Sequence, residues 1–462
     1  MAVSVSRFFD ELRKKRVVFI GVGVSHTRLI EKFLEKGIGV TVCDKRSAEQ
    51  MGETYESLLK QGARFRLGEG YLEALDDADV IFRTPGMYFN SPALSEARKK
   101  GKVVTSEMEC FFDLCPCRIY AVTGSDGKTT TTTLISKFLE AQGKRVWLGG
   151  NIGKALLPEI EEVKEDDAAV VELSSFQLIS MRRSPDVAVI TNVAPNHLDV
   201  HKSYQEYIEA KENVFLHQGK GGVTVFNADN EDSRASARKA PGEVRWFSRQ
   251  GRVENGVFLE DGVLYQAEGG SVTPILPISD IALPGMHNVE NYMAAFAAVR
   301  GLVSAETMDA VARSFHGVEH RIERIRVRRG VRWYNDSIAS SPSRTIAGLR
   351  SFPEKVILIA GGKDKGISYD AIGPEINEHV KYLILCGATA AVIRESVLKA
   401  GNYAGLPIRE VADYHEAVAL ADEVSGEGDV VILSPASTSF DRFANFMERG
   451  RVFKDIVNAL PD

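Results

Sequence analysis

The chain has 462 residues, of which 44% are hydrophobic and 26% are charged, and this ordinary globular composition excludes a disordered, collagen-like or fibrous protein. The 57 Lys and Arg residues against 63 Asp and Glu residues give a formal net charge of −6, so we expect no broad nucleic-acid binding, which relies on clustered positive charge. At roughly 150 residues per domain, the length predicts about three domains.

The N-terminal residues become charged before any apolar stretch of signal-peptide length develops, and the most apolar runs fall far short of the ~20 residues that span a bilayer. We therefore expect a cytoplasmic protein without membrane insertion. The five cysteines are an odd and sparse set, which favours reduced thiols over a disulfide framework. Cys110, Cys115 and Cys117 lie close together, but a zinc site would want a fourth ligand and a C-x-x-C pair, so ordinary thiols are favoured.

Short, β-branched, nearly continuous apolar runs recur along the chain and predict strands that are buried on both faces. Amphipathic stretches separate most of them, which predicts parallel sheets with crossover helices and therefore the α/β class. The expected strands include residues 16–20, 39–43, 79–82, 118–122, 168–172, 186–191, 331–334, 355–359, 382–386 and 429–433.

Residues 242–284 differ in texture, because they combine glycines and short alternating runs with few helix signals. They predict a small antiparallel excursion inside the second domain. The strand pattern predicts that new sheets begin near residues 106 and 317. We therefore expect domains over residues 1–106, 107–318 and 319–462, each built around a mainly parallel sheet with flanking helices.

Polar clusters follow the expected strands, and ligands of open parallel sheets bind beyond the carboxyl ends of the strands. The first cluster holds Gly21, Gly23 and Ser25, and Asp44 ends the next strand. This is half of a dinucleotide fingerprint, because the third glycine is absent. It fits a nucleotide or diphosphate at the helix N-terminus, with Asp44 accepting hydrogen bonds from a ribose or a base. A tight turn without a ligand stays open.

A second cluster, Thr84, Pro85 and Gly86, follows the strand expected at residues 79–82. Exposed backbone amides at this position fit the same ligand. A plain Pro-Gly turn explains the residues equally well, so the sequence does not decide between the two.

The strongest signal is the run TGSDGKTT at residues 123–130, between a strand and a helix that is expected to reach about residue 141. Backbone N–H groups of such a loop wrap phosphates, Lys128 reaches the β- and γ-oxygens, and Thr129 binds Mg²⁺. The two glycines stand closer together than in the common P-loop, but the strand–loop–helix context favours a functional loop. The residues expected to contact ATP here are Gly124, Ser125, Asp126, Gly127, Lys128, Thr129 and Thr130.

Candidate metal ligands follow the next strands. Glu172 ends the strand at 168–172 and suits the same Mg²⁺, while Ser174 after it is typical of a helix N-cap, and both roles are compatible. His197 stays open between a core or capping histidine and a ligand. Lys211, on the helix that follows, is most simply a solvated helix lysine.

Asn288 and Asn291 lie three positions apart on another expected helix and so share a face. Two amides on one face suit the hydrogen-bonding edge of an adenine, and N-capping by Asn288 with a solvated Asn291 stays open. In the last third of the chain, polar clusters at residues 335–337, 361–366 and 434–441 each follow a strand. Together they predict one anion-binding rim.

These motifs together resemble the Mur ligase family over essentially the whole chain. TGSDGKTTTT is similar to the ATP loop of the family, ELSSFQL to its Mg²⁺-binding segment, TNVAPNHLDVH to its histidine segment and GMHNVENYMAA to its adenine-binding helix. NDSIASSPSRT, GGKDKG and LSPASTSFDRFANFMERG resemble the C-terminal signatures of the members that add D-glutamate. The DNPR-type motif of the relatives that add diaminopimelate or lysine is not present.

The resemblance implies three domains: a Rossmann-like N-terminal domain that binds UDP-MurNAc-L-Ala, a P-loop ATPase-like central domain that binds ATP and Mg²⁺, and a Rossmann-like C-terminal domain that binds D-glutamate. It implies ATP-dependent amide bond formation through an acyl phosphate, in peptidoglycan precursor synthesis, by a monomer. Another Mur-family ligase or a folylpolyglutamate synthase-like ligase is the alternative enzyme. A P-loop switch that only hydrolyses nucleotide and a nicotinamide dehydrogenase are alternatives of other classes.

Residue roles are implied in the same way. The implied catalytic residues are Lys128, His197 and Lys211. The implied Mg²⁺ ligands are Thr129, Glu172, His197 and Lys211, with Lys211 carbamylated so that a cation becomes an anionic oxygen ligand. Further ATP contacts are implied for Asn288, Asn291, Arg321 and Asp336. The implied substrate contacts are Gly23, Ser25, Asp44, Thr84, Gly86, Asn151, Ser174, Ser340, Lys365, Ser439, Phe440 and Phe446.

One position departs from the family pattern. Ile338 stands where a lysine near the reacting phosphate is expected, and Ser340 keeps a hydroxyl where threonine is usual. We expect the role of that lysine to be absent or to be taken over by Arg344 or Lys363.

Overall fold

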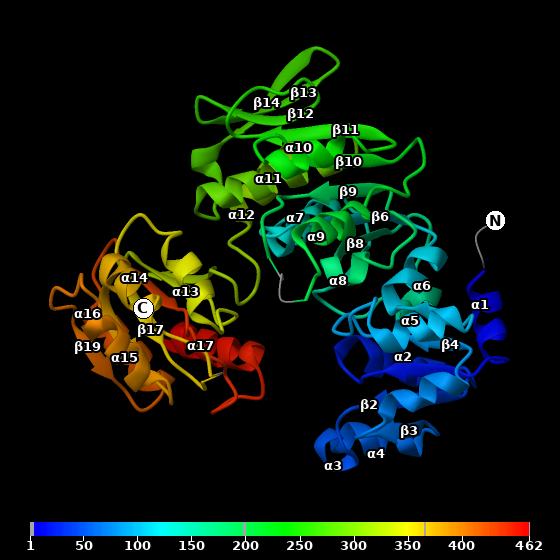
Figure 1. The fold of residues 1–462 in the computed structure, drawn as a ribbon. Coiled ribbons are helices and arrows are strands. Elements are labelled where there is room, and N and C mark those ends of the chain that lie inside the picture. Colours follow the sequence, from blue (N-terminus) through cyan, green and yellow to red (C-terminus); the bar gives the residue numbers. More distant parts are fainter. Residues whose placement is uncertain (1–3, 197–199, 365, 462) are drawn as a thin grey trace. The chain divides into compact units, whose positions relative to one another are not determined.

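A computed structural model describes residues 4–196, 200–364 and 366–461 of the chain. The chain folds into two compact units, one of Met1–Ile281 with His287–Arg313 and one of Ala282–Met286 with Ser314–Asp462 (Figure 1). In the described ranges three sheets form, two in the first unit and one in the second. The predicted three-domain α/β architecture is confirmed.

The N-terminal sheet is parallel throughout, with the strand order β3-β2-β1-β4-β5. Its strands are β1 (Val17–Ile20), β2 (Val40–Asp44), β3 (Arg64–Leu67), β4 (Val80–Phe82) and β5 (Val103–Thr105). Its helices are α1 (Val5–Leu12), α2 (Val24–Glu35), α3 (Ala48–Met51), α4 (Glu53–Lys60), η1 (Tyr71–Asp77), α5 (Pro92–Lys99) and α6 (Glu107–Leu114). The strand order reverses between β1 and β4, so the loops after these two strands lie at the switch point where such sheets bind ligands.

The central sheet has the order β14-β13-β12-β11-β10-β9-β6-β8-β7. Its strands are β6 (Arg118–Thr123), β7 (Val146–Gly150), β8 (Ala168–Glu172), β9 (Val187–Ile190), β10 (Val223–Asn227), β11 (Glu243–Ser248), β12 (Gly256–Glu260), β13 (Val263–Glu268) and β14 (Ser271–Pro277). Its helices are α7 (Lys128–Ala141), η2 (Leu157–Glu162), α8 (Ser175–Leu178), α9 (Tyr204–Glu212), α10 (Glu231–Ala237), η3 (Ile278–Asp280), α11 (Met286–Val299) and α12 (Ala305–Ser314).

The antiparallel excursion is present but smaller than residues 242–284. β11 pairs parallel with β10 and β12 pairs parallel with β11, and only β13 and β14 run antiparallel to their neighbours. The excursion extends the parallel sheet, because each new strand adds to the edge left by the one before.

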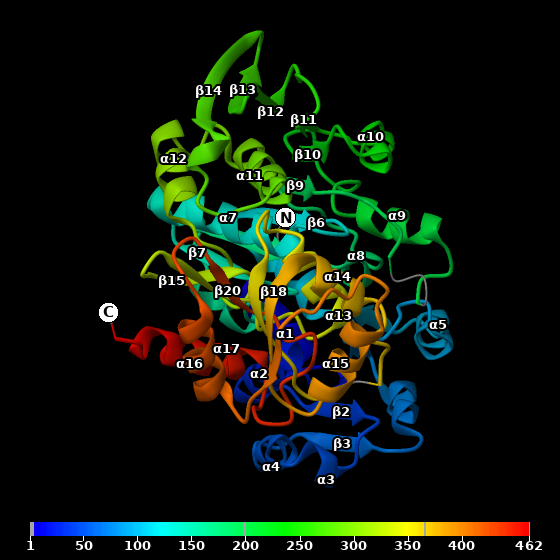
Figure 2. The same cartoon turned by 90° about the vertical axis from the view of Figure 1, so that its left-hand side faces the viewer.

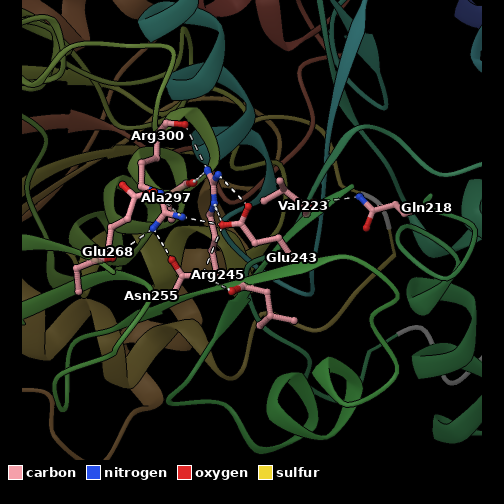
Figure 3. A network of polar contacts seen from close by, with 10 residues as sticks. Gln218, Val223, Glu243, Arg245, Asn255, Glu268, Ala297 and Arg300 are labelled. Atoms are coloured by element: carbon pink, nitrogen blue, oxygen red, sulfur yellow. Dashed lines mark hydrogen bonds and ion pairs between the residues drawn. The ribbon is translucent and has the colours of Figure 1, made fainter. Parts of the chain in front are cut away.

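A polar network fixes the C-terminal end of α11 on this extension (Figure 3). Arg300 follows the helix and donates hydrogen bonds to Asn255 Oδ1 (2.6 Å) and Glu243 Oε1 (2.7 Å). Arg245 donates to the carbonyl of Ala297 in the last turn (3.0 Å). Positively charged groups near the carbonyls at the end of a helix are favourable. The network therefore stabilises a helix that carries predicted site residues at its other end.

The sheet of the second unit has the order β15-β16-β20-β17-β18-β19 and is parallel except for the β15–β16 pair (Figure 2). Its strands are β15 (Glu323–Arg328), β16 (Val331–Asn335), β17 (Val356–Ala360), β18 (Val380–Leu385), β19 (Ile408–Glu410) and β20 (Val430–Leu433). Its helices are α13 (Pro342–Leu349), α14 (Ile372–His379), α15 (Ala390–Lys399), α16 (Tyr414–Val424) and α17 (Phe446–Ala459).

Helix length also bears on the membrane prediction. Among the described residues, no helix combines the length and the apolar composition that a bilayer crossing needs. The five cysteines are buried free thiols in the described chain, and Cys115 Sγ lies 3.5 Å from Cys117 Sγ.

Candidate nucleotide and metal site

The loop between β6 and α7 is shaped by two glycines. Gly124 has φ +153° and Gly127 has φ +76°, values that L side chains rarely adopt. A Cβ at Gly124 would also clash with the hydroxyl of Thr191, and one at Gly127 would clash with the amide oxygen of Asn291. Lys128 is the first residue of α7, so the loop ends at a helix N-terminus, where backbone N–H groups and the helix dipole favour an anion.

Polar groups of the loop are held by specific partners. The ammonium of Lys128 donates to the carbonyls of Gly124 (3.0 Å) and Ser125 (2.9 Å), so it lies over the loop. The hydroxyl of Ser125 accepts from the N–H of Ala194 and lies 3.0 Å from the hydroxyl of Tyr207. The Ser125 side chain therefore stabilises the loop, and any contact it makes to ATP falls to its backbone.

Glu172, at the end of β8, brings two predicted residues together. Its side chain is only 2% exposed, and its two oxygens accept hydrogen bonds from Thr129 Oγ1 (2.7 Å) and Asn151 Nδ2 (2.8 Å). Ser174 caps α8 through a capping box with Gln177, so the predicted capping role is confirmed. A buried carboxylate with a hydroxyl beside it has the oxygen chemistry that Mg²⁺ prefers.

Lys211 lies on α9 with 2% of its surface exposed, so the interpretation as a solvated lysine is wrong. Its ammonium donates to the carbonyl of Gly124 (2.7 Å) and lies 4.5 Å from the ring centroid of Tyr207. Burial, together with the nearby charge of Lys128, holds the pKa of Lys211 well below its usual value. The sequence could not show this burial, because α9 reaches the loop from a segment about 80 residues away.

Asn288 and Asn291 are buried on one face of α11, as predicted, and Asn291 Nδ2 donates to Asn288 Oδ1 (3.2 Å). The helix begins at Met286, so Asn288 lies in the first turn and is not the N-cap. Thr131 of α7 donates to Asn291 Oδ1 (3.2 Å). The pair is thus attached to the same helix that follows the phosphate loop.

The N-terminal cluster also forms a defined turn at the switch point, where Gly23 and Ser25 follow β1, Asp44 ends β2, and Thr84 and Gly86 follow β4. Gly23 is the N-cap of α2, and Gly21 faces the methyl group of Thr84. Asp44 accepts from the N–H of Val22 (3.1 Å) and pairs with Arg46 (2.6 Å). Burial alone would raise the pKa of Asp44, but these hydrogen bonds hold it below its usual value.

In the second unit, Asp336 follows β16 and is buried. It accepts hydrogen bonds from Ser434 Oγ (2.8 Å) and the N–H of Ile322 (3.3 Å). Burial raises the pKa of Asp336 to about 7, and the charge of Arg321 partly opposes the shift.

The other predicted residues of this unit are spread over two loops and a helix. Ser439 is buried, Phe440 is 63% exposed, and Phe446 begins α17 with its ring 6.0 Å from that of His320. His197 and Lys365 lie outside the described residues.

Of the two candidate substitutes for the lysine expected at position 338, one contacts Ile338 in the structure. Arg344 Nη1 donates to the carbonyl of Ile338 (3.3 Å), and Ser340 Oγ donates to the same carbonyl (3.0 Å). Lys363 is exposed, and its backbone pairs with Thr438. Of the two, Arg344 is the cation that contacts Ile338, the position that differs from the family pattern.

Three residues at the site were missed as functional candidates. Thr191 donates to the carbonyl of Asp126 (2.5 Å), and Asn192 Oδ1 accepts from the N–H of Asp126 (2.9 Å). Their signal was their position directly after β9. Arg83, directly before the Thr84 turn, is buried, and nothing in the local sequence shows this.

Comparisons with known proteins agree along the chain. The family model described as Mur ligase MurD-like, N-terminal domain matches residues 15–106; the one described as Mur ligase middle domain matches residues 122–299; and the one described as Mur ligase, glutamate ligase domain matches residues 320–437.

Two curated relatives match the chain from end to end. The UDP-N-acetylmuramoylalanine–D-glutamate ligase of Acetivibrio thermocellus is 51% identical, with 100% of both chains covered, and that of Ruminiclostridium cellulolyticum is 49% identical, with 99% of both covered. Among solved structures, MurF from Acinetobacter baumannii has a TM-score of 0.61 at 14% identity and covers 98% of this chain and 99% of its own. That likeness supports the fold.

Proposed function

Because the chain belongs to the Mur ligase family, we propose that it joins D-glutamate to UDP-MurNAc-L-Ala, with conversion of ATP to ADP and phosphate, in peptidoglycan precursor synthesis. The observation that carries the proposal is the 51% identity over the full length of a UDP-N-acetylmuramoylalanine–D-glutamate ligase. In this proposal residues 1–106 bind the UDP substrate, residues 107–318 bind ATP and residues 319–462 bind D-glutamate.

The chemistry requires activation of a poor acyl donor. The L-alanyl carboxylate attacks the γ-phosphorus of ATP and ADP leaves, which forms an acyl phosphate. The amine of D-glutamate then attacks the acyl carbon, loses a proton and expels phosphate. Both steps bring anions together, so groups that balance negative charge at the β6–α7 loop carry the catalysis.

Lys128 is placed for that task, because its ammonium lies over the phosphate-binding loop. Thr129 and Glu172 fit a bound Mg²⁺, since they already share a hydrogen bond and offer oxygen ligands. Bound Mg²⁺ supplies further positive charge beside the phosphates. Asn151 adjoins Glu172 and in this proposal orients the muramoyl substrate.

Lys211 serves, in this proposal, as a carbamate that ligates a second Mg²⁺ together with His197. Addition of CO₂ to the amine forms an N–C bond and releases one proton, and only the neutral amine has the lone pair for it. The lowered pKa of Lys211 favours that neutral form. The hydrogen bond from the Lys211 amine to the carbonyl of Gly124 (2.7 Å) supports this role at the phosphate loop.

D-glutamate is held, in this proposal, by Lys365, Ser439 and Phe446, with Phe440 and Ser340 nearby. Arg344 takes over the role of the lysine expected at position 338. Its hydrogen bond to the carbonyl of Ile338 supports this assignment. Asn288 and Asn291 complete the ATP site, in this proposal, by contacting the adenine.

The test is an ADP-release assay over a small panel of acceptors and amino acids. We expect release only with UDP-MurNAc-L-Ala and D-glutamate together. Turnover of a folate with L-glutamate would instead indicate a folylpolyglutamate synthase-like ligase. Phosphate release that does not depend on any amino acid would indicate a nucleotide switch, and binding of reduced nicotinamide cofactor would indicate a dehydrogenase.

A further inference from the structure

The turn after β4 is attached to the helices α8 and α9 of the central sheet region, through the residue before the turn and the residue after it. The turn comprises residues 84–87, closed by a hydrogen bond from the N–H of Met87 to the carbonyl of Thr84 (3.0 Å). Arg83 directly precedes it and Tyr88 directly follows it, and both side chains reach elements of the central sheet. All of these residues belong to the first compact unit (Figure 1).

Arg83 makes the first attachment. Its guanidinium is 1% exposed and donates to Ser180 Oγ (2.6 Å) and to the carbonyl of Phe176 (2.9 Å). A weaker contact joins it to the carbonyl of Met87 in the turn (3.5 Å). One guanidinium therefore joins the turn to α8, the helix that follows Glu172 by three residues.

Tyr88 makes the second attachment. Its hydroxyl donates to Glu206 Oε1 (2.5 Å) on α9, the helix that carries Lys211. The two attachments thus lead from one turn to the two helices that adjoin the proposed metal ligands. Thr84 and Gly86, between the attachments, are proposed contacts of the UDP substrate.

If Arg83 only stabilised the fold, burial of its charged guanidinium would carry a large free-energy cost of desolvation. Among the described residues, its buried Nε–H has no hydrogen-bond partner. A buried charge is often replaced by an apolar side chain of similar volume without loss of stability. A planar fork that bonds several carbonyls, by contrast, fixes two segments in one relative position.

We infer that Arg83 is a positioning residue for the ligation: it fixes the UDP-substrate turn relative to α8 and the end of β8, so that the substrate carboxylate meets the ATP phosphate at the right distance. This inference rests on the proposed function. Tyr88 assists it through α9. A shift of about 1 Å between reacting groups lowers rates about 100-fold, so loss of the fork acts on the chemical step more than on binding.

The test compares Arg83→Met with Arg98→Met in steady-state kinetics. Arg98 is a matched control, because its guanidinium lies over the ring of Phe89 (3.9 Å), as that of Arg83 does (5.5 Å), but it donates hydrogen bonds to residues of the N-terminal sheet region. For Arg83→Met we expect kcat to fall about 10- to 100-fold, while the KM values for ATP and D-glutamate change less than about threefold. Arg83→Lys should recover part of kcat, and Arg98→Met should keep it.

Binding and melting are measured on the same proteins, and the kinetics are run well below the melting temperature of each variant. Calorimetric Kd values for UDP-MurNAc-L-Ala and for a non-hydrolysable ATP analogue should match those of the wild type. If kcat of Arg83→Met stays within threefold of wild type, or if only the KM for the UDP substrate rises, the inference is wrong. If the wild-type chain itself releases no ADP with D-glutamate, the proposed function fails instead.

Discussion

Replacement of Lys211 tests the proposed carbamate most directly. Lys211→Met removes the amine but keeps an unbranched apolar side chain of similar length in a buried place. Loss of one preorganised group that balances charge at the phosphates costs about 3–4 kcal/mol, which is a 100- to 1,000-fold fall in kcat. Lys211→Arg should fall as far, because a guanidinium retains the positive charge and cannot form the carbamate.

Stability should move in the opposite direction. The pKa of Lys211 is lowered in the folded chain, so between that value and the ordinary value of 10.5 the unfolded chain holds a proton that the folded chain lacks. Unfolding is then favoured as the pH falls through this window. In CO₂-free buffer at neutral pH, Lys211→Met should therefore melt no lower than the wild type, although it is nearly inactive.

The assay combines turnover with carbon-13 NMR of protein equilibrated with labelled CO₂. We expect one carbamate carbonyl signal that is absent from Lys211→Met, and partial recovery of Lys211→Ala by formate or acetate. Wild-type turnover in Lys211→Met, or an identical spectrum in both proteins, would refute the reasoning.

Four further changes probe other parts of the site. Lys128→Ala should abolish ADP formation with an unchanged melting temperature, since its ammonium donates to carbonyls of the loop and is proposed to act on phosphate; normal turnover would contradict this. Lys365→Ala should raise the KM for D-glutamate strongly and that for ATP little, and an equal rise in both would assign Lys365 to the nucleotide or to domain closure. Asp336→Asn should stabilise the fold at pH 8 but not at pH 4, because the pKa of Asp336 is raised to about 7 and its contribution to stability is lost as the pH rises from about 4 to 7; a shift of this size corresponds to roughly 4 kcal/mol, read as a change in melting temperature with pH, and equal shifts at both pH values would argue against it. Ile338→Lys should not raise kcat, because Arg344 already occupies that neighbourhood, whereas a several-fold increase would show that the lost lysine had not been replaced.

Local sequence patterns were sufficient for much of the fold. The apolar runs predicted as strands at residues 168–172 and 355–359 are β8 (Ala168–Glu172) and β17 (Val356–Ala360), because a strand that is covered on both faces must be apolar along its whole length. Gly124 and Gly127 likewise indicated the loop in the sequence. The structure gives the reason, because their backbone conformation and the space beside them exclude a side chain. The position of α7 after that loop followed from the same short segment.

Tertiary structure alone decided which distant groups meet. Burial of Lys211, the bonds of Asn151 and Thr129 to Glu172, and the link from Arg83 to α8 all join segments that are far apart in the chain. A short segment carries no record of such partners, because it specifies its own periodicity and turns but not the elements that later cover it. For the same reason the sequence left Lys211 as a solvated helix residue, whereas packing of α9 against the phosphate loop buries its amine and lowers its pKa.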